Sequence, residues 1–155
     1  MKSIFKTTLY SLLFLFLAAC SKSDDNASNN SNEPNSSAEF IKFKCNGTLY
    51  EFSEPEIINS LSKSILAFEP NVKRITLFVP LNVSPGTYPI VNMPSNVNAY
   101  GVFINIIPIG LDGSSASGNM IITSVNGSNV KGTFTCTISS NGQNFEITEG
   151  SFNAG

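Results

Sequence analysis

The sequence predicts an all-β protein, either an antiparallel β-sandwich or a partly open barrel built from β-hairpins. Between residues 39 and 155, hydrophobic residues occur in short runs, and turn residues separate these runs at intervals of roughly ten residues. Several runs alternate apolar and polar residues, which is the pattern of a strand with one buried face. Asn-Gly and Pro-Gly pairs, which favour tight turns, stand between the runs. Together these observations indicate a sheet of short antiparallel strands.

The first elements follow from alternation and turn chemistry. Segment 40–45 places Ile41, Phe43 and Cys45 on one face, and Asn46-Gly47 predicts a two-residue turn into a second strand over 48–52. The next residues, Ser-Glu-Pro-Glu at 53–56, match a capping box. We therefore expect one short helix near residues 55–62.

The middle of the chain predicts four further strands. Residues 65–68 and 74–79 should pair around Pro70-Asn71, and the turn at Pro85-Gly86 precedes a short strand at 87–90. Segment 100–107 is apolar on both faces, which is typical of a central strand covered on both sides. The Gly/Ser-rich segment 110–118 lacks the lysine of a phosphate-binding loop, and we interpret it as a long flexible connection.

The last third predicts a meander of three strands. They are expected over residues 120–125, 131–139 and 144–152, with turns at 126–129 and 141–142. In the middle strand Phe134, Cys136 and Ile138 share one face, and threonines occupy the other. One face should therefore be buried and the other solvated. Gly150 interrupts the last strand and indicates a bulge.

The N-terminus has the parts of a secretory signal over residues 1–19. A lysine-containing start precedes a short apolar run, and Leu17-Ala-Ala-Cys20 resembles the bacterial lipobox. A transmembrane anchor is the alternative, but a span needs about 20 apolar residues and this run is shorter. The lipobox implies that Cys20 becomes the first residue and carries acyl chains such as palmitate. These acyl chains would anchor the protein in a bacterial outer membrane.

Residues 20–38 predict a flexible tether, because this segment is rich in Ser and Asn and has no aromatic residue. Its beginning, with Lys22 followed by Asp24 and Asp25, resembles an export signal that sends Bacteroidota lipoproteins to the cell surface. Alternatively the two acids only keep the tether soluble, and the protein faces the periplasm. Residues 39–155 then form the single β-domain.

Two cysteines remain besides Cys20. Cys45 and Cys136 both fall on inward faces, so they form either a disulfide or two separate buried thiols. A zinc site is disfavoured, because two thiolates without histidine fall short of four ligands.

Composition excludes several functions. The chain has no histidine, which removes Ser-His-Asp and Cys-His catalysis, and its net charge of −2 argues against a nucleic-acid partner. The domain's glutamates have no spacing that singles out a catalytic pair. We therefore expect no catalytic residue, cofactor or metal.

The sequence contains three further motifs, Gly86-Thr-Tyr88, Gly132-Thr-Phe-Thr-Cys-Thr137 and Ile147-Thr-Glu-Gly-Ser-Phe-Asn153. Together they resemble a family of Bacteroidota cell-envelope lipoproteins that carry one β-sandwich domain of unknown function behind a lipobox. The resemblance implies that the second and third motifs form a hairpin. Cys136 departs from the aromatic or aliphatic residue expected at its position, and the family offers no catalytic residue to carry over.

These observations favour a lipid-anchored, non-catalytic module that binds a protein or a glycan. A glycan would need exposed rings for stacking, and Tyr50, Tyr88 and Tyr100 are the candidates. The alternatives are a structural or accessory envelope protein and, less favoured, a carboxylate-based hydrolase.

Overall fold

Ten β-strands form one antiparallel sheet in the residues that the structure, a computed structural model, describes: 38–92 and 97–155. The strands are β1 (Phe40–Cys45), β2 (Thr48–Ser53), β3 (Glu56–Asn59), β4 (Lys63–Glu69), β5 (Lys73–Val79), β6 (Gly86–Ile90), β7 (Gly101–Ile106), β8 (Leu111–Asn126), β9 (Asn129–Ser140) and β10 (Gln143–Ala154). A single 3-10 turn, η1 (Ile107–Ile109), follows β7. The all-β prediction is confirmed. The predicted signal peptide, Cys20, and the export residues Lys22, Asp24 and Asp25 lie outside the described residues.

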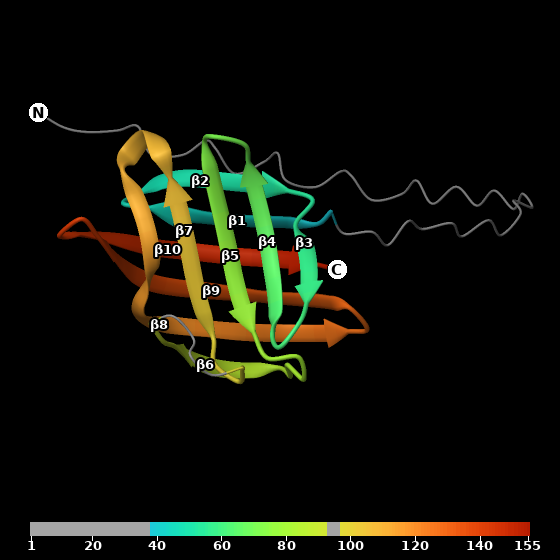
Figure 1. The fold of residues 1–155 in the computed structure, drawn as a ribbon. Helices are drawn as coiled ribbons and strands as arrows, with labels where there is room; N and C mark the ends of the chain where they lie inside the picture. Colours follow the sequence, from blue (N-terminus) through green and yellow to red (C-terminus); the bar gives the residue numbers. More distant parts are fainter. Residues whose placement is uncertain (1–37, 93–96) are drawn as a thin grey trace, which may run out of the picture. The chain divides into compact units, whose positions relative to one another are not determined.

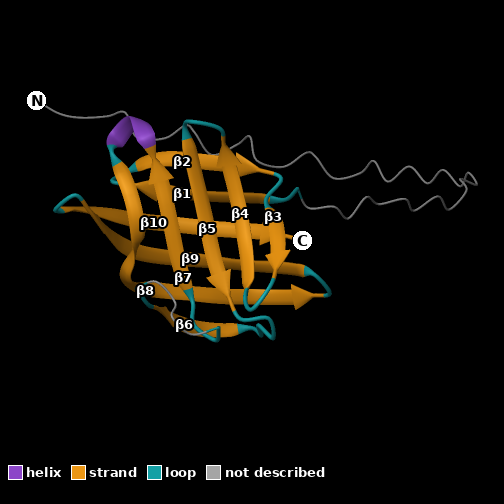
Figure 2. Ribbon diagram, viewed as in Figure 1, coloured by secondary structure: helices purple, strands orange, loops and turns teal. Residues whose placement is uncertain are grey.

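The sheet curls into two facing layers (Figures 1 and 2). Strand order is β2-β1-β10-β9-β8-β7-β5-β4-β3, and β6 pairs with β8 off this path. Layer A contains β2, β1, β10, β9, β6 and the second part of β8; layer B contains β3, β4, β5, β7 and the first part of β8. The two sets of strands cross at a steep angle in Figure 1, and the core lies between them. Since the described strands β2 and β3 do not pair, the barrel stays partly open.

Strand β8 carries the chain from one layer to the other. Its first residues, up to Ser114, pair with β7, whereas Gly118–Ile122 pair with β6. At the bulge between these parts, buried Ser115 accepts a hydrogen bond from the Val102 amide and donates one to the Val91 carbonyl. The segment 110–118 is thus mostly strand, and our expectation of a flexible connection was wrong. Its small residues let the strand bend at the corner instead.

The predicted hairpin turns are confirmed. Asn46 and Gly47 have φ of 46° and 85°, which is the left-handed pair that a type I′ turn requires. Asn141-Gly142 repeats this geometry between β9 and β10, and the chain turns at residues 127–128 between β8 and β9. Local turn chemistry therefore sets the register of these hairpins.

The helix expected near residues 55–62 is absent, and β3 occupies the segment instead. Glu54 adopts a left-handed φ of 52° and buried Pro55 follows, so the chain turns sharply out of layer A. β3 then pairs with β4 and places Ile57 against the core. Pairing with β4 satisfies the backbone hydrogen bonds of this segment, whereas a helix of this length is unstable by itself, so the capping signal is overridden.

The second and third motifs form the predicted hairpin, β9–β10, and each motif supplies a glycine opposite a phenylalanine of the other. Gly132 pairs with Phe152, and Gly150 pairs with Phe134. A Cβ on Gly150 would lie 2.4 Å from the Phe134 carbonyl oxygen, and one on Gly132 would lie 2.7 Å from the Phe152 ring. The glycines thus make room for aromatic rings across the pair. A register shift between Ile147 and Gly150 confirms the predicted bulge.

Within residues 38–92 and 97–155, the structure contains no helix with the length and hydrophobicity needed to cross a membrane.

Candidate functional site

The outward side of layer B exposes more hydrophobic surface than a solvated sheet face needs. We call it the apolar face and define it by six residues that lie on the outward side of layer B or continue it: Ile58, Leu66, Phe68, Phe78, Phe103 and Ile107. Exposed fractions reach 53% for Phe68 and 58% for Ile107. Apolar side chains grouped on an exposed surface are a feature of binding sites in soluble proteins.

Strand register assembles this face from three parts of the chain. Phe68 on β4 pairs with Arg74 on β5, and Arg74 pairs with Asn105 on β7. The adjacent row contains Leu66, Thr76 and Phe103 in the same order. Since side chains in register on one face lie about 5 Å apart, both rows form continuous strips across layer B.

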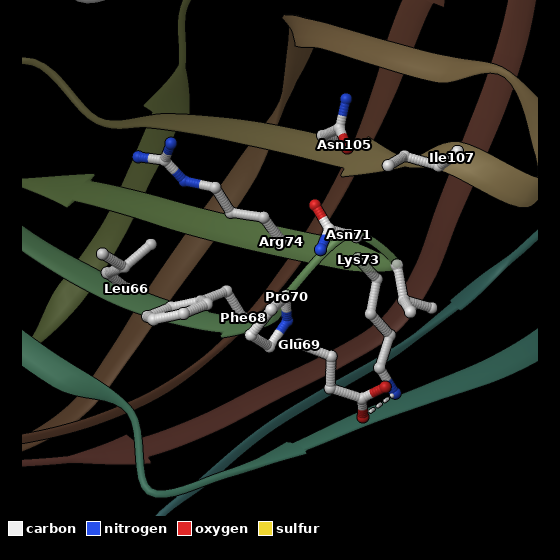
Figure 3. Close-up of a pocket in the computed structure, with 10 residues that line it drawn as sticks. Leu66, Phe68, Glu69, Pro70, Asn71, Lys73, Arg74, Asn105 and Ile107 are labelled. Carbon is white, nitrogen blue, oxygen red and sulfur yellow. Dashed lines mark ion pairs between the residues drawn. The ribbon is translucent and has the colours of Figure 1, made fainter.

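A shallow depression of about 390 Å³ lies at one end of the face, where the β4–β5 turn meets η1. Its walls include Leu66, Phe68 and Ile107, and its polar groups include Arg74, Asn71 and Asn105 (Figure 3). A hydrogen bond from the Ile107 amide to the Val72 carbonyl, 3.0 Å long, holds the turn against η1. The depression therefore combines apolar walls with one guanidinium, two amide groups and, at its rim, the Glu69–Lys73 ion pair.

Lys73, next to Arg74, is engaged elsewhere. Its Nζ lies 2.8 Å from the Glu69 carboxylate and donates a hydrogen bond to the Glu51 carbonyl of β2. It also lies 4.8 Å from the centre of the Phe52 ring. Lys73 thereby fastens layer B to the edge of layer A.

Arg74 remains available for a ligand. Its guanidinium carbon lies 5.8 Å from the centre of the Phe103 ring, and it forms no ion pair with any described residue. A guanidinium that lies over an aromatic ring still has N–H donors that can form two parallel hydrogen bonds with a carboxylate.

The face also holds an unpaired hydroxyl. Thr76 is 3% exposed, and its Oγ1 has no hydrogen-bond partner among the described residues. A buried polar group without a partner costs about 1–3 kcal/mol. The Thr76 hydroxyl, at the centre of the apolar face, therefore lowers the free energy of unfolding of the domain.

The structure brings two of the three predicted stacking tyrosines together, but not as an open platform. The Tyr88 and Tyr100 rings stack on each other with centroids 4.2 Å apart, and Tyr100 is buried. The Tyr88 hydroxyl donates to the Ser84 carbonyl at 3.0 Å. Tyr50 lies apart from them, stacked on Phe43 at 5.6 Å. Burial raises the pKa of Tyr50 and of Tyr100, and neighbouring groups raise it further.

Cys45 and Cys136 are both buried and free. Ile147 of β10 lies between them, because it pairs with Cys45 on one side and with Cys136 on the other. Two strand spacings separate their Cα atoms by about 10 Å, beyond the limit of about 7 Å for a disulfide. The disulfide considered from the sequence is therefore not formed in this structure. Burial, with smaller contributions from Glu146 and Cys45, raises the pKa of Cys136 to about 12.

The carboxylates do not converge. The glutamates at positions 51, 54, 56, 69, 146 and 149 are all exposed, and the described residues contain no cluster of three or more metal-ligating His, Cys, Asp or Glu side chains. Two of these glutamates form ion pairs: Glu69 with Lys73, and Glu149 with Lys44 at 2.8 Å.

The apolar face was not predicted from the sequence. The apolar residues on both sides of segment 100–107 were interpreted as the mark of a strand that is covered on both faces. β7 is central, as predicted, with Val102, Ile104 and Ile106 buried on its inner side. Its outer side is not covered: Phe103 is only half-buried and Ile107 is exposed. A strand that is apolar on both faces can thus mark an exposed binding surface as well as a buried layer.

No family model, curated protein or solved structure matches this chain.

Proposed function

We propose that this chain is a lipid-anchored protein of the bacterial outer membrane whose β-domain is a non-catalytic module that binds a partner protein. The observation that carries the proposal is the apolar face, where Phe68 and Ile107 stay more than half exposed. Aromatic and aliphatic side chains grouped on one surface are typical of the centre of a protein interface. The lipobox at Cys20 and the tether that follows support placement at the membrane.

A glycan is the second candidate partner. The depression supports it, because the exposed Phe68 ring and the amide side chains of Asn71 and Asn105 all line it. Its aliphatic walls favour a protein, since glycan sites depend mainly on aromatic rings and polar groups. A structural role in the envelope is the remaining alternative, and it would require no specific partner.

Binding is tested by site-specific photo-crosslinking in cells that express the full lipidated chain. Crosslinkers at positions 68 and 107 should capture a discrete partner, and a crosslinker at Ile121, which is 43% exposed on layer A, serves as the matched control. Phe68→Ser and Ile107→Ser should abolish capture by a crosslinker placed at position 58. Equal capture from all positions would contradict the proposal.

Placement is tested separately. Cys20→Ala should prevent incorporation of a labelled fatty acid and release the protein from the membrane fraction. The export signal predicts that protease added to intact cells removes the domain, and that Lys22, Asp24 and Asp25 replaced by Ser protect it. A domain protected in the wild-type protein would favour the periplasmic face.

A further inference from the structure

The apolar face carries one cation whose charge is not balanced locally. Arg74 is exposed, and its neighbours in the row, Phe68 and Asn105, are neutral. No carboxylate of the described residues pairs with it, whereas Lys73 beside it already pairs with Glu69. The N–H donors of the guanidinium can therefore bind an anion that is not part of the domain.

The surroundings of Arg74 restrict the kind of anion. Leu66, Phe68 and Ile107 form the apolar walls of the depression, and a strongly hydrated ion such as phosphate would gain nothing from them (Figure 3). A carboxylate joined to apolar groups would satisfy both the guanidinium and the walls. Asn71 and Asn105 add amide groups that can pair with a peptide backbone.

The size of the face decides between a second folded copy and a short segment. Four strands about 4.8 Å apart and five residues of about 3.4 Å each cover an area of roughly 300 Å². A stable interface between folded proteins needs about 800 Å² on each partner. The apolar face by itself therefore does not supply the area of a stable homodimer interface, whereas its length matches an extended segment of about five residues.

We infer that the apolar face binds an extended peptide segment of a partner protein, in which an Asp or Glu carboxylate pairs with Arg74 and flanking aliphatic side chains cover Phe68 and Ile107. This inference rests on the proposed function and specifies the chemistry of the partner.

The inference is tested with the full chain in detergent and synthetic eight-residue peptides that carry aliphatic residues on both sides of a central glutamate. Fluorescence anisotropy should show at least tenfold tighter binding for these peptides than for the same peptides with glutamine. Arg74→Met, which keeps an apolar stem, should remove this preference, and Arg74→Lys should restore part of it. Lys42→Met, an exposed cation of layer A, is the matched control and should leave the preference unchanged.

Other outcomes would overturn the inference. Equal affinity for glutamate and glutamine peptides, or a preference that survives Arg74→Met, would exclude the carboxylate pairing. Arg74-dependent binding of a uronic-acid oligosaccharide without peptide binding would identify a glycan instead. A dimer detected by sedimentation and lost in Phe68→Ser would identify a second copy as the occupant.

Failure of the inference is distinguishable from failure of the proposed function. If Phe68→Ser abolishes cellular crosslinking but Arg74→Met does not, a partner binds the face without the carboxylate contact. If neither variant changes crosslinking, the apolar face is not the binding surface. Thermal unfolding of each variant, which changes only exposed side chains, confirms that the domain remains folded.

Discussion

The two layers of the sheet orient most of their phenylalanines in opposite directions. In layer A the side chains of Phe43, Phe52, Phe134, Phe145 and Phe152 are buried in the core, and only Phe40, which is half-buried, lies on the outward face beside Lys42. In layer B, Phe68, Phe78 and Phe103 point outward, and the inward positions hold mainly aliphatic residues. The outward side of layer A is mostly polar, with threonines at 133, 135 and 137. Layer A therefore places most of its phenylalanines where they stabilise the fold, whereas layer B places them on its outward face.

The difference between the two layers distinguishes side chains that stabilise the fold from side chains that we propose for binding. An aromatic ring buried between layers contributes its full apolar area to folding. The same ring on an outward face contributes much less, so a group of three requires another explanation. Binding is that explanation in our proposal. Substitutions in the interior of layer A should therefore affect folding, and those on the apolar face should mainly affect recognition.

The largest effect is expected at Gly150. Gly150→Ala would place a Cβ within 2.4 Å of the Phe134 carbonyl oxygen and 2.8 Å of its ring. We expect the free energy of unfolding to fall by about 3 kcal/mol, because overpacking a tight contact forces the backbone to shift. Chemical denaturation measures this loss. Thr135→Ala, at an exposed position of β9, should change stability by less than about 0.5 kcal/mol, and similar values for both would show that layer A is not tightly packed.

A medium effect is expected from alkaline pH. Burial raises the pKa of the Cys136 thiol from 9.0 to about 12, so the folded state retains a proton that the unfolded chain loses above pH 9. The contribution of the Cys136 thiol to the free energy of unfolding is fully present below pH 9. It should fall by about 1.4 kcal/mol per pH unit as the pH rises toward 12. Cys45 acts in the same direction.

Urea unfolding at pH 8 and at pH 10 measures this loss. Cys136→Ala should reduce the pH slope, although it also removes packing at every pH. An unchanged slope in this variant would show that other groups, such as tyrosines, cause the alkaline loss.

The smallest effect is expected on the apolar face. Thr76→Val replaces a buried hydroxyl that has no partner by a methyl group of similar size, so the free energy of unfolding should rise by about 1 kcal/mol. Thr135→Val, where the hydroxyl is exposed, should have almost no effect. A loss of stability in Thr76→Val would mean that the hydroxyl has a hydrogen-bond partner, such as water, in solution.

Local patterns were sufficient to predict most strands. Alternation of Ile41, Phe43 and Cys45, and the Asn-Gly pairs at 46–47 and 141–142, predicted β1 and the hairpin turns correctly, because both signals act over a few residues. The bulge near Gly150 was predicted for the same reason. The helix near 55–62 and the loop at 110–118 were wrong, because pairing with β4, and with β7, β6 and β9, decides those segments over long sequence distances.

The sequence alone determined that residues 39–155 form an all-β domain with hairpins, and it is also the only basis for the predicted lipobox, tether and membrane placement. Only the tertiary structure decided which face is buried in strands such as β4 and β7, because both sides of these strands carry apolar residues and alternation alone does not state which side meets the opposite layer. The tertiary structure also stacks the rings of Tyr88 and Tyr100 on each other. It places Phe68, Arg74 and Asn105 in one row on the outward side of layer B. These three residues come from three strands, and only the register between strands brings them together.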